Sequence, residues 1–98
     1  MSEYILSPEA IVDLQDIFDF TLGEWGEAQA EKYLNEIYAV FDRLTQHPQI
    51  GRLRVELADG LRSIPVAAHV IYFMPWQSDV AIVHVLHGAR DVESVFGQ

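Results

Sequence analysis

Apolar residues recur at every third or fourth position in two consecutive stretches of the chain, which is the spacing of one face of an α-helix. The first stretch follows Ser7-Pro8, a pair that favours a helix start because the serine hydroxyl can accept from a first-turn amide. Its core-facing positions are Ala10, Ile11, Leu14, Ile17, Phe18, Thr21, Leu22 and Trp25. The period resumes after Gly26 with Ala30, Tyr33, Leu34, Ile37, Tyr38, Phe41 and Leu44. The pattern predicts two amphipathic helices, the second ending near His47 because Pro48 disfavours helical geometry in the preceding residue.

The short joint at Gly23 to Gly26 favours an antiparallel helical hairpin. We place the acidic residues of the first helix on its solvated side: Glu9, Asp13, Asp16, Asp19 and Glu24. The aromatic residues Phe18, Trp25, Tyr33, Tyr38 and Phe41 are interpreted as core or hairpin-seam residues. An exposed subset of them would instead form a docking groove.

From Gly51 the period changes from 3.6 to 2, which predicts strands. Leu53, Val55 and Leu57 alternate with charged residues, as in a half-buried strand with a charged outer face. Further strands are predicted at 61–66, 67–74 and 80–86, with 75–79 as a hairpin loop and the apolar residues 3–6 as a short N-terminal strand. Pro65 limits its strand to an edge, a bulge or a strand end. Residues 89–96 have a weak helical pattern and are expected to form a short final helix or a frayed end.

The predicted fold class is therefore α+β in two layers, with residues 1–98 as a single domain. An N-terminal strand and an antiparallel helical hairpin pack on a sheet of three or four antiparallel strands. No apolar run approaches the roughly 20 residues of a membrane-spanning helix, so we expect no membrane partner and a cytoplasmic location.

The chain has no cysteine and a formal charge of −9, which narrows its chemistry. Without cysteine there is no disulfide, thiolate zinc site or cysteine nucleophile. Residues 1–50 hold ten acidic side chains against Lys32 and Arg43, a net −8, whereas residues 51–98 hold five against four arginines, a net −1. Nucleic-acid binders depend on neutralising phosphates, so we expect no tight direct binding to DNA or RNA. No phosphate-binding or dinucleotide glycine motif is present, and no cofactor is expected.

Arg52, Arg54 and Arg62 are the most distinctive charged feature. They form either a solvated strand face, paired with Glu56, or a contact surface for an acidic protein segment. The two readings have equal weight on sequence alone.

The histidines give a second set of candidates. Strand alternation puts His69 on a face with Ile71 and Phe73, and puts His84 on a face with Ile82 and Leu86. Partly buried, satisfied histidines are the simpler interpretation of both. His87 is expected on the opposite face from His84, and His87 and Arg90 lie at a strand end, where a role in partner binding is as plausible as a structural one. His84 and His87 lack an acid at a matching position, so no metal site is predicted.

Several motifs, taken in order, resemble the ParE branch of the ParE/RelE toxins of bacterial toxin–antitoxin systems. They are Ser7-Pro8, Ala10 and Asp13-Leu14; Ala30, Tyr33 and Phe41; His47-Pro48 and Gly51-Arg52; Glu56-Leu57 and Gly60-Leu61-Arg62; His69-Val70-Ile71-Tyr72; and Val85 to Asp91. The resemblance implies a RelE/ParE-like fold and a toxin, not an enzyme, that inhibits DNA gyrase by binding. It also implies a ParD-like antitoxin as the neutralising partner in a hetero-oligomer.

The family's RelE-type ribonucleases are strongly basic and usually carry a late tyrosine, whereas this chain is acidic, has one lysine and has no tyrosine after Tyr72. Many ParE relatives are also basic with acidic antitoxins, so the acidity here favours apolar anchors for the partner, with arginines fixing the register. We predict partner binding, to antitoxin or gyrase, at Arg52, Arg54, Arg62, His87 and Arg90, and no catalytic residue. Two alternatives stay open: a ribosome-dependent ribonuclease using His87, Arg62, Arg90 and Tyr72, and a non-toxic co-regulator that only binds its antitoxin.

Overall fold

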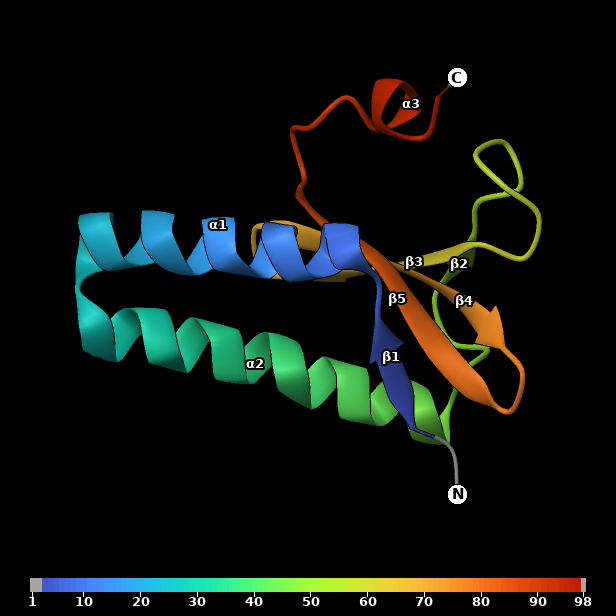
Figure 1. The fold of residues 1–98 in the computed structure, drawn as a ribbon, viewed down its shortest axis with the longest axis horizontal. Helices are drawn as coiled ribbons and strands as arrows, with labels where there is room; N and C mark the ends of the chain where they lie inside the picture. The colour runs from blue at the N-terminus through green and yellow to red at the C-terminus, as the bar shows by residue number, and fades with distance from the viewer. Residues whose placement is uncertain (1–2, 98) are drawn as a thin grey trace.

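The computed structural model describes residues 3–97 and has a helical hairpin beside a five-stranded sheet (Figure 1). Along the chain the elements are β1 (Tyr4–Leu6), α1 (Pro8–Trp25), α2 (Glu27–Gln46), β2 (Arg52–Leu53), β3 (Arg62–Val66), β4 (His69–Trp76), β5 (Asp79–His87) and α3 (Val92–Val95). This order confirms the predicted two-layer α+β fold and its short final helix. No helix within residues 3–97 is long and apolar enough to cross a membrane.

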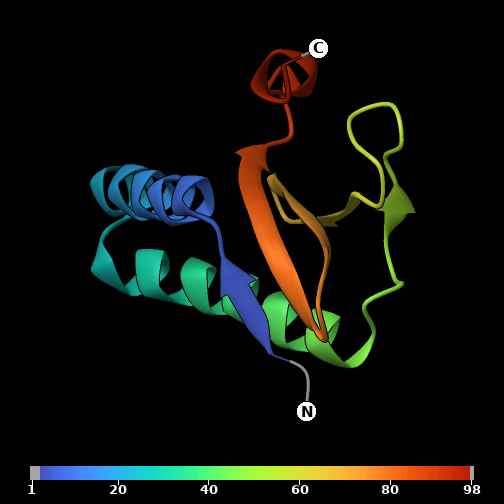
Figure 2. The same ribbon diagram turned by 45° about the vertical axis from the view of Figure 1, so that its right-hand side comes forward.

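The sheet has the strand order β1-β5-β4-β3-β2. β1 runs parallel to β5, and the other neighbours are antiparallel, so the sheet is mixed rather than purely antiparallel. The pairing of β1 with β5 joins two ends of the chain that the sequence pattern could not connect (Figure 2). Pro65 pairs with Val70 on β4, and β2 covers only the first two residues of β3, so the other side of Pro65 is an open edge where proline is tolerated.

Local sequence signals set the ends of the two long helices. The Ser7 hydroxyl accepts from the Ala10 amide at 2.9 Å and donates to the Val83 carbonyl at 2.7 Å, so one side chain both caps α1 and ties it to β5. Gly26, with φ of +89°, forms the joint between the helices. Both helices therefore begin and end close to where the sequence predicted.

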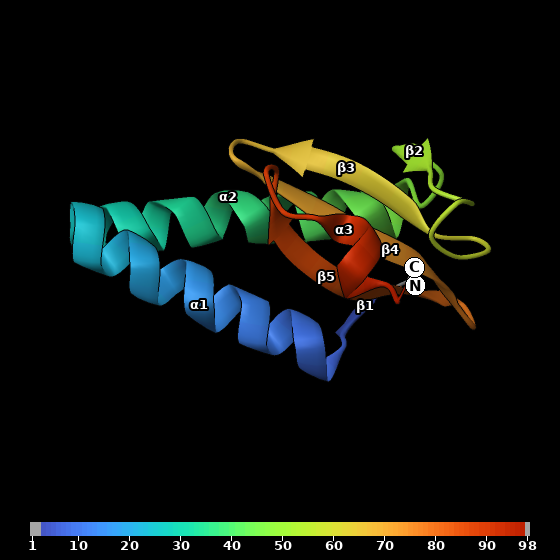
Figure 3. The ribbon, with the colours of Figure 1, turned by 90° about the horizontal axis from the view of Figure 1, so that it is seen from above.

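The main core lies between the helical hairpin and one face of the sheet (Figure 3). Leu14 and Ile17 of α1 and Ile37 and Phe41 of α2 pack against residues of β4 and β5 that include Phe73. A second, smaller apolar cluster covers the opposite face. It comprises Leu57, Leu61, Tyr72 and Leu86, with Ala58, Val70, Met74, Val83, Val92, Val95 and Phe96 packed against them.

The segment after β2 differs from the predicted strand. The alternation of Leu53, Val55 and Leu57 suggested a half-buried strand, but Leu53 and Val55 are 49% and 65% exposed. The strand ends at Leu53, and the Leu57 amide donates to the Arg54 carbonyl in a turn. The turn buries Leu57 and Leu61, which are four residues apart, so the segment follows a turn spacing rather than a strand period.

An irregularity in β5 corrects the predicted face of His84. Tyr72 pairs with His84 but Phe73 pairs with Ile82, so Val83 is an extra residue that forms a bulge. Ile82 consequently lies in the main core, whereas Leu86 lies in the second cluster. The expectation that Ile82 and Leu86 share a face was wrong, because a bulge shifts the alternation by one residue.

Candidate partner-binding groove

A groove of about 500 Å³ runs along α1, and we call it the α1 groove. One wall is formed by α1 from Asp13 to Trp25, and the other by the β3–β4 turn and the end of β5. The side chains of Ile17, Phe20, Thr21 and Trp25 lie along the first wall. Ala68 and His69, then Val85, Leu86, His87 and Arg90, lie along the second, and Gln29 and Tyr33 of α2 complete the lining.

His69 and His87 are neighbours across β4 and β5 at one end of this groove. Their ring centroids are 5.4 Å apart in an edge-to-face arrangement. The Tyr33 hydroxyl lies 2.6 Å from His69 Nδ1 and accepts from the Ala68 amide at 3.2 Å. Burial, followed by the proximity of His87, lowers the pKa of His69, and burial raises the pKa of Tyr33. Both groups are therefore neutral near pH 7, and Tyr33 fixes the β3–β4 turn against α2.

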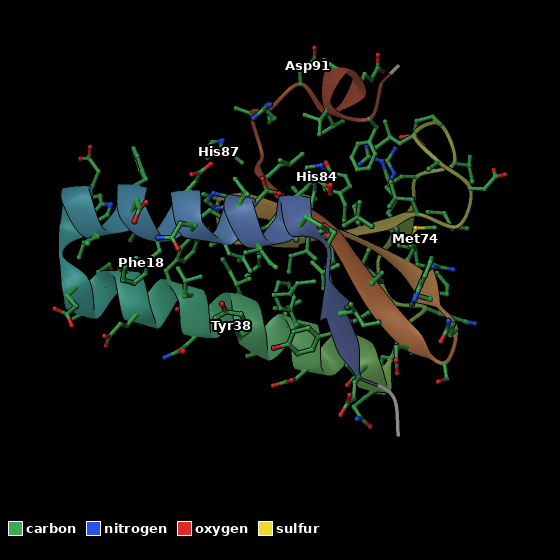
Figure 4. The ribbon with its side chains drawn as sticks, viewed as in Figure 1. Phe18, Tyr38, Met74, His84, His87 and Asp91 are labelled. Carbon is green, nitrogen blue, oxygen red and sulfur yellow. The ribbon has the colours of Figure 1, made fainter. Side chains whose placement is uncertain are left out.

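His87 is more accessible than His69. Its Nδ1 accepts from the Ala89 amide at 3.0 Å, which leaves Nε2 for solvent or a partner. Figure 4 shows His87 near the start of the segment that leads to α3. The prediction that His87 faces away from His84 holds, because His87 lines the α1 groove while His84 packs edge-on against Phe96.

Asp13 has a structural role that the sequence did not indicate. Its Oδ2 lies 2.7 Å from His84 Nδ1 and accepts from the Val85 amide at 2.9 Å. The side chains of Asp13 and His84 are only 17% and 16% exposed. Asp13 was predicted on the solvated face, but its carboxylate instead accepts from a backbone amide at the edge of β5. This amide, of Val85, lies beyond the three residues of β5 that pair with β1.

Large apolar side chains on α1 remain exposed beside the groove. Phe20 is 67% and Trp25 is 72% exposed, and every residue from 22 to 29 is exposed. Ile11, Val12 and Leu22 are exposed too, so the assignment of Ile11, Leu22 and Trp25 to the core was wrong. A helix that is apolar on several sides has more apolar surface than this domain covers. The excess of apolar positions on α1 was the signal available in the sequence.

A second hollow, of about 450 Å³, lies between α1, α2 and β1. Its apolar lining includes Ile11, Leu14, Phe18, Leu34 and Tyr38, of which Figure 4 labels Phe18 and Tyr38. α1 is therefore flanked by apolar hollows on two sides.

The five predicted partner-binding residues fall into two separate groups. His87 and Arg90 line the α1 groove. Arg52, Arg54 and Arg62 lie on or next to β2 and β3. His87 pairs with His69 and Arg62 pairs with Phe73, four residues further along β4, which is about 13 Å at the usual strand rise.

Two of these three arginines bond within the domain. Arg54 donates to Glu56 at 2.8 Å and to the Ser63 hydroxyl at 3.2 Å, and its guanidinium lies 5.6 Å from the Tyr72 ring centre. The hydrogen bond to Glu56 raises the pKa of Arg54 and lowers that of Glu56. Arg62 donates to the Gly51 carbonyl at 3.1 Å. Arg52 is exposed, and its side chain hydrogen-bonds to nothing within residues 3–97.

The residues of the alternative ribonuclease site do not converge. Tyr72 is 3% exposed and packs in the second cluster, with Phe96 5.4 Å from its ring. His87 and Arg90 lie in the α1 groove, and Arg62 lies along β3. Over the described part of the chain, no group of three histidine or acidic residues has metal-binding geometry.

The fold and this groove define a small α+β domain with an apolar surface suited to binding a protein segment. The chain belongs to the ParE toxin family of type II toxin–antitoxin systems, whose family model matches residues 4–92. It is 37% identical over 93 residues to Toxin ParE1 of Mycobacterium tuberculosis (strain CDC 1551 / Oshkosh), covering 94% of this chain and 95% of the relative. Toxin ParE1 of Caulobacter vibrioides is 31% identical over 97 residues, covering 99% of this chain and all of the relative.

The fold also resembles a solved structure. A chain from the chromosomal ParDE toxin–antitoxin system of P. aeruginosa superposes with a TM-score of 0.77 at 20% identity. The match covers 89% of this chain and 96% of that chain. It confirms the expected RelE/ParE-like fold.

Proposed function

We propose that this chain is the toxin of a type II toxin–antitoxin pair, that it inhibits DNA gyrase by binding, and that a ParD-like antitoxin neutralises it. The observation that carries the proposal is the family match over residues 4–92, together with relatives named Toxin ParE1 that align over almost their whole length. The place of action is then the cytoplasm, where gyrase meets its DNA.

Action by binding, rather than by the ribonuclease alternative, is supported by the placement of the side chains that this alternative needs. Its acid, base and cationic groups would have to reach the same substrate. Tyr72 is buried on one face of the sheet, whereas His87 lines a groove on the other side. Arg62 is engaged with Gly51.

Contact with the partner is assigned to His87, Arg90 and Arg52 first, because these three side chains are exposed. Arg54 and Arg62 remain candidates, but they also support the domain through Glu56, Ser63 and Gly51. Arg90→Ala and Arg52→Ala therefore test binding with little effect on folding. Arg54→Ala is expected to change both partner binding and the stability of the fold.

The test is expression of the chain with and without a candidate ParD-like antitoxin from the same genome. Expression alone is expected to arrest growth with induced DNA damage, and purified protein is expected to inhibit DNA supercoiling by gyrase. Co-expression of the antitoxin is the control and restores growth. Codon-phased cuts in translated messages with unaffected gyrase would replace this proposal by the ribonuclease. Antitoxin binding without toxicity would replace it by the co-regulator.

A further inference from the structure

The helical hairpin combines exposed apolar side chains with uncompensated negative charge. Nine acidic residues lie between residues 8 and 46, against Lys32 and Arg43, which gives a net charge of −7. The nine are Glu9, Asp13, Asp16, Asp19, Glu24, Glu27, Glu31, Glu36 and Asp42. All except Asp13 are exposed.

In the described part of the chain, no salt bridge pairs these exposed carboxylates with a cation. Over residues 3–97 the salt bridges are Arg54 with Glu56, which is outside the hairpin, and His84 with Asp13. Asp19 accepts a hydrogen bond from Gln15 at 3.1 Å, which does not neutralise its charge. The hairpin therefore presents an acidic field around its apolar surface.

The α1 groove fits a helical occupant. Ile17, Phe20, Thr21 and Trp25 recur at three and four residues along one wall, and ridges of this spacing accept the side chains of a second helix. The wall from Asp13 to Trp25 comprises thirteen residues and is about 18 Å long at the α-helical rise, which matches about three turns of a docked helix. A helix that lays its apolar face into such a groove is a common mode of peptide recognition.

The charge decides which helix fits. A second copy of this chain would bring another net −9 and a second acidic hairpin, so like charges would oppose a homodimer. An acidic segment meets the same repulsion. Lysine or arginine beside the apolar stripe would instead pair with Asp16, which lines the α1 wall, and would be attracted by the exposed carboxylates elsewhere on the hairpin.

We propose that the α1 groove takes a basic amphipathic helix from the antitoxin, with lysine or arginine flanking an apolar stripe that covers Phe20 and Trp25. This inference rests on the proposed function for the source of the helix. It departs from the acidic antitoxin that the family resemblance leads one to expect. Arg90 and His87, at the opposite wall, leave room for one carboxylate on the partner, which would fix the direction of the helix.

The test uses two dye-labelled 15-residue helical peptides with the same apolar stripe, one with lysine and one with glutamate at the flanking positions. Their binding to the full chain is measured by fluorescence anisotropy. The lysine peptide is expected to bind at least about tenfold more tightly in 50 mM salt, with the advantage shrinking in 500 mM salt because the surface charges are then screened.

Two matched pairs of variants separate groove binding from general attraction to an acidic protein. Asp16→Lys is expected to reduce the preference for the lysine peptide over the glutamate peptide. Asp59→Lys makes the same charge change at an exposed site outside the hairpin and is expected to reduce this preference less. Phe20→Ser is expected to weaken the lysine peptide strongly. Trp76→Ser, which removes an exposed aromatic residue at the β4–β5 turn, is expected to leave it unchanged.

The inference is overturned if the glutamate peptide binds as tightly, if neither peptide binds, or if Phe20→Ser and Trp76→Ser behave alike. The candidate antitoxin is measured in parallel by its rescue of growth. Rescue without a preference for the lysine peptide would refute the basic helix and leave the proposed function standing. A chain that prefers the lysine peptide but never arrests growth would refute the proposed function while the property of the groove remains.

Discussion

Replacing Asp13 should reveal how strongly α1 is attached to the sheet. In Asp13→Ala, the Val85 amide loses its acceptor at 2.9 Å, and His84 Nδ1 loses its partner at 2.7 Å. A buried donor left without a partner costs about 1–3 kcal/mol, and the small exposed fractions of Asp13 and His84 allow water to recover part of it. We therefore expect a loss of about 3 kcal/mol in the free energy of unfolding for the two contacts together.

The measurement is urea unfolding at pH 7, followed by circular dichroism. In thermal unfolding, a change of this size corresponds to a fall of about 12–24 °C in Tm for a domain of this length. Asp13→Asn keeps an oxygen that can accept from the Val85 amide, so it should lose about 1 kcal/mol. Asp16→Ala is the matched control, because Asp16 is exposed and lies three residues further along α1. Its free energy of unfolding should stay within about 0.5 kcal/mol of that of the parent chain.

Hydrogen exchange supplies a local readout for the same variant. Exchange of the Val85 amide should accelerate in Asp13→Ala more than exchange of amides in the centre of β4. If Asp13→Ala unfolds at the same urea concentration as Asp16→Ala, the proposed attachment of α1 to β5 through this carboxylate is refuted.

Two further predictions concern pH and backbone conformation. Burial lowers the pKa of His69 below its ordinary value of 6.5. As the pH falls below about 6.5, His69 therefore takes up a proton more readily in the unfolded chain than in the folded one. The free energy of unfolding should fall with it. His69→Gln should flatten the dependence of Tm on pH between pH 5.5 and 7.5, and an unchanged slope would contradict this. Gly51→Ala should cost at least about 3 kcal/mol, because φ is +92° and a Cβ would lie 2.7 Å from the Ser63 carbonyl oxygen. Gly60→Ala, with φ of +77° and open space around it, should cost only about 1 kcal/mol in the same urea titration.

The helices and central strands could be predicted because their patterns are long and locally determined. α1 and α2 carry the apolar period over 18 and 20 residues, and Ser7-Pro8 marks the start of the first. The predicted strand through Leu53, Val55 and Leu57 was wrong beyond Leu53, because three alternating apolar residues fit a strand as well as a turn. Its hydrogen bonds, such as the Leu57 amide to the Arg54 carbonyl at 2.9 Å, decide for the turn.

The candidate site was only partly predictable. His87 and Arg90 were recognised as strand-end residues, and both line the α1 groove. Asp13 was missed because its helical position borders both the polar and the apolar side of α1, and only the docking of α1 on β5 brings it to His84. Trp25 was assigned to the seam because a periodic pattern does not show where the sheet beneath a helix ends.

The attachment of β1 and α1 to β5 has a consequence for synthesis of the chain. Tyr4 pairs with Val80, and Asp13 meets His84, so residues more than 70 positions apart must come together. α1 and α2 can form their hairpin early, but its apolar side has no sheet to cover until β5 has left the ribosome. Folding of the toxin is thus completed only when almost the whole chain has been translated, and a chain released early would expose the apolar face of the hairpin to chaperones and proteases.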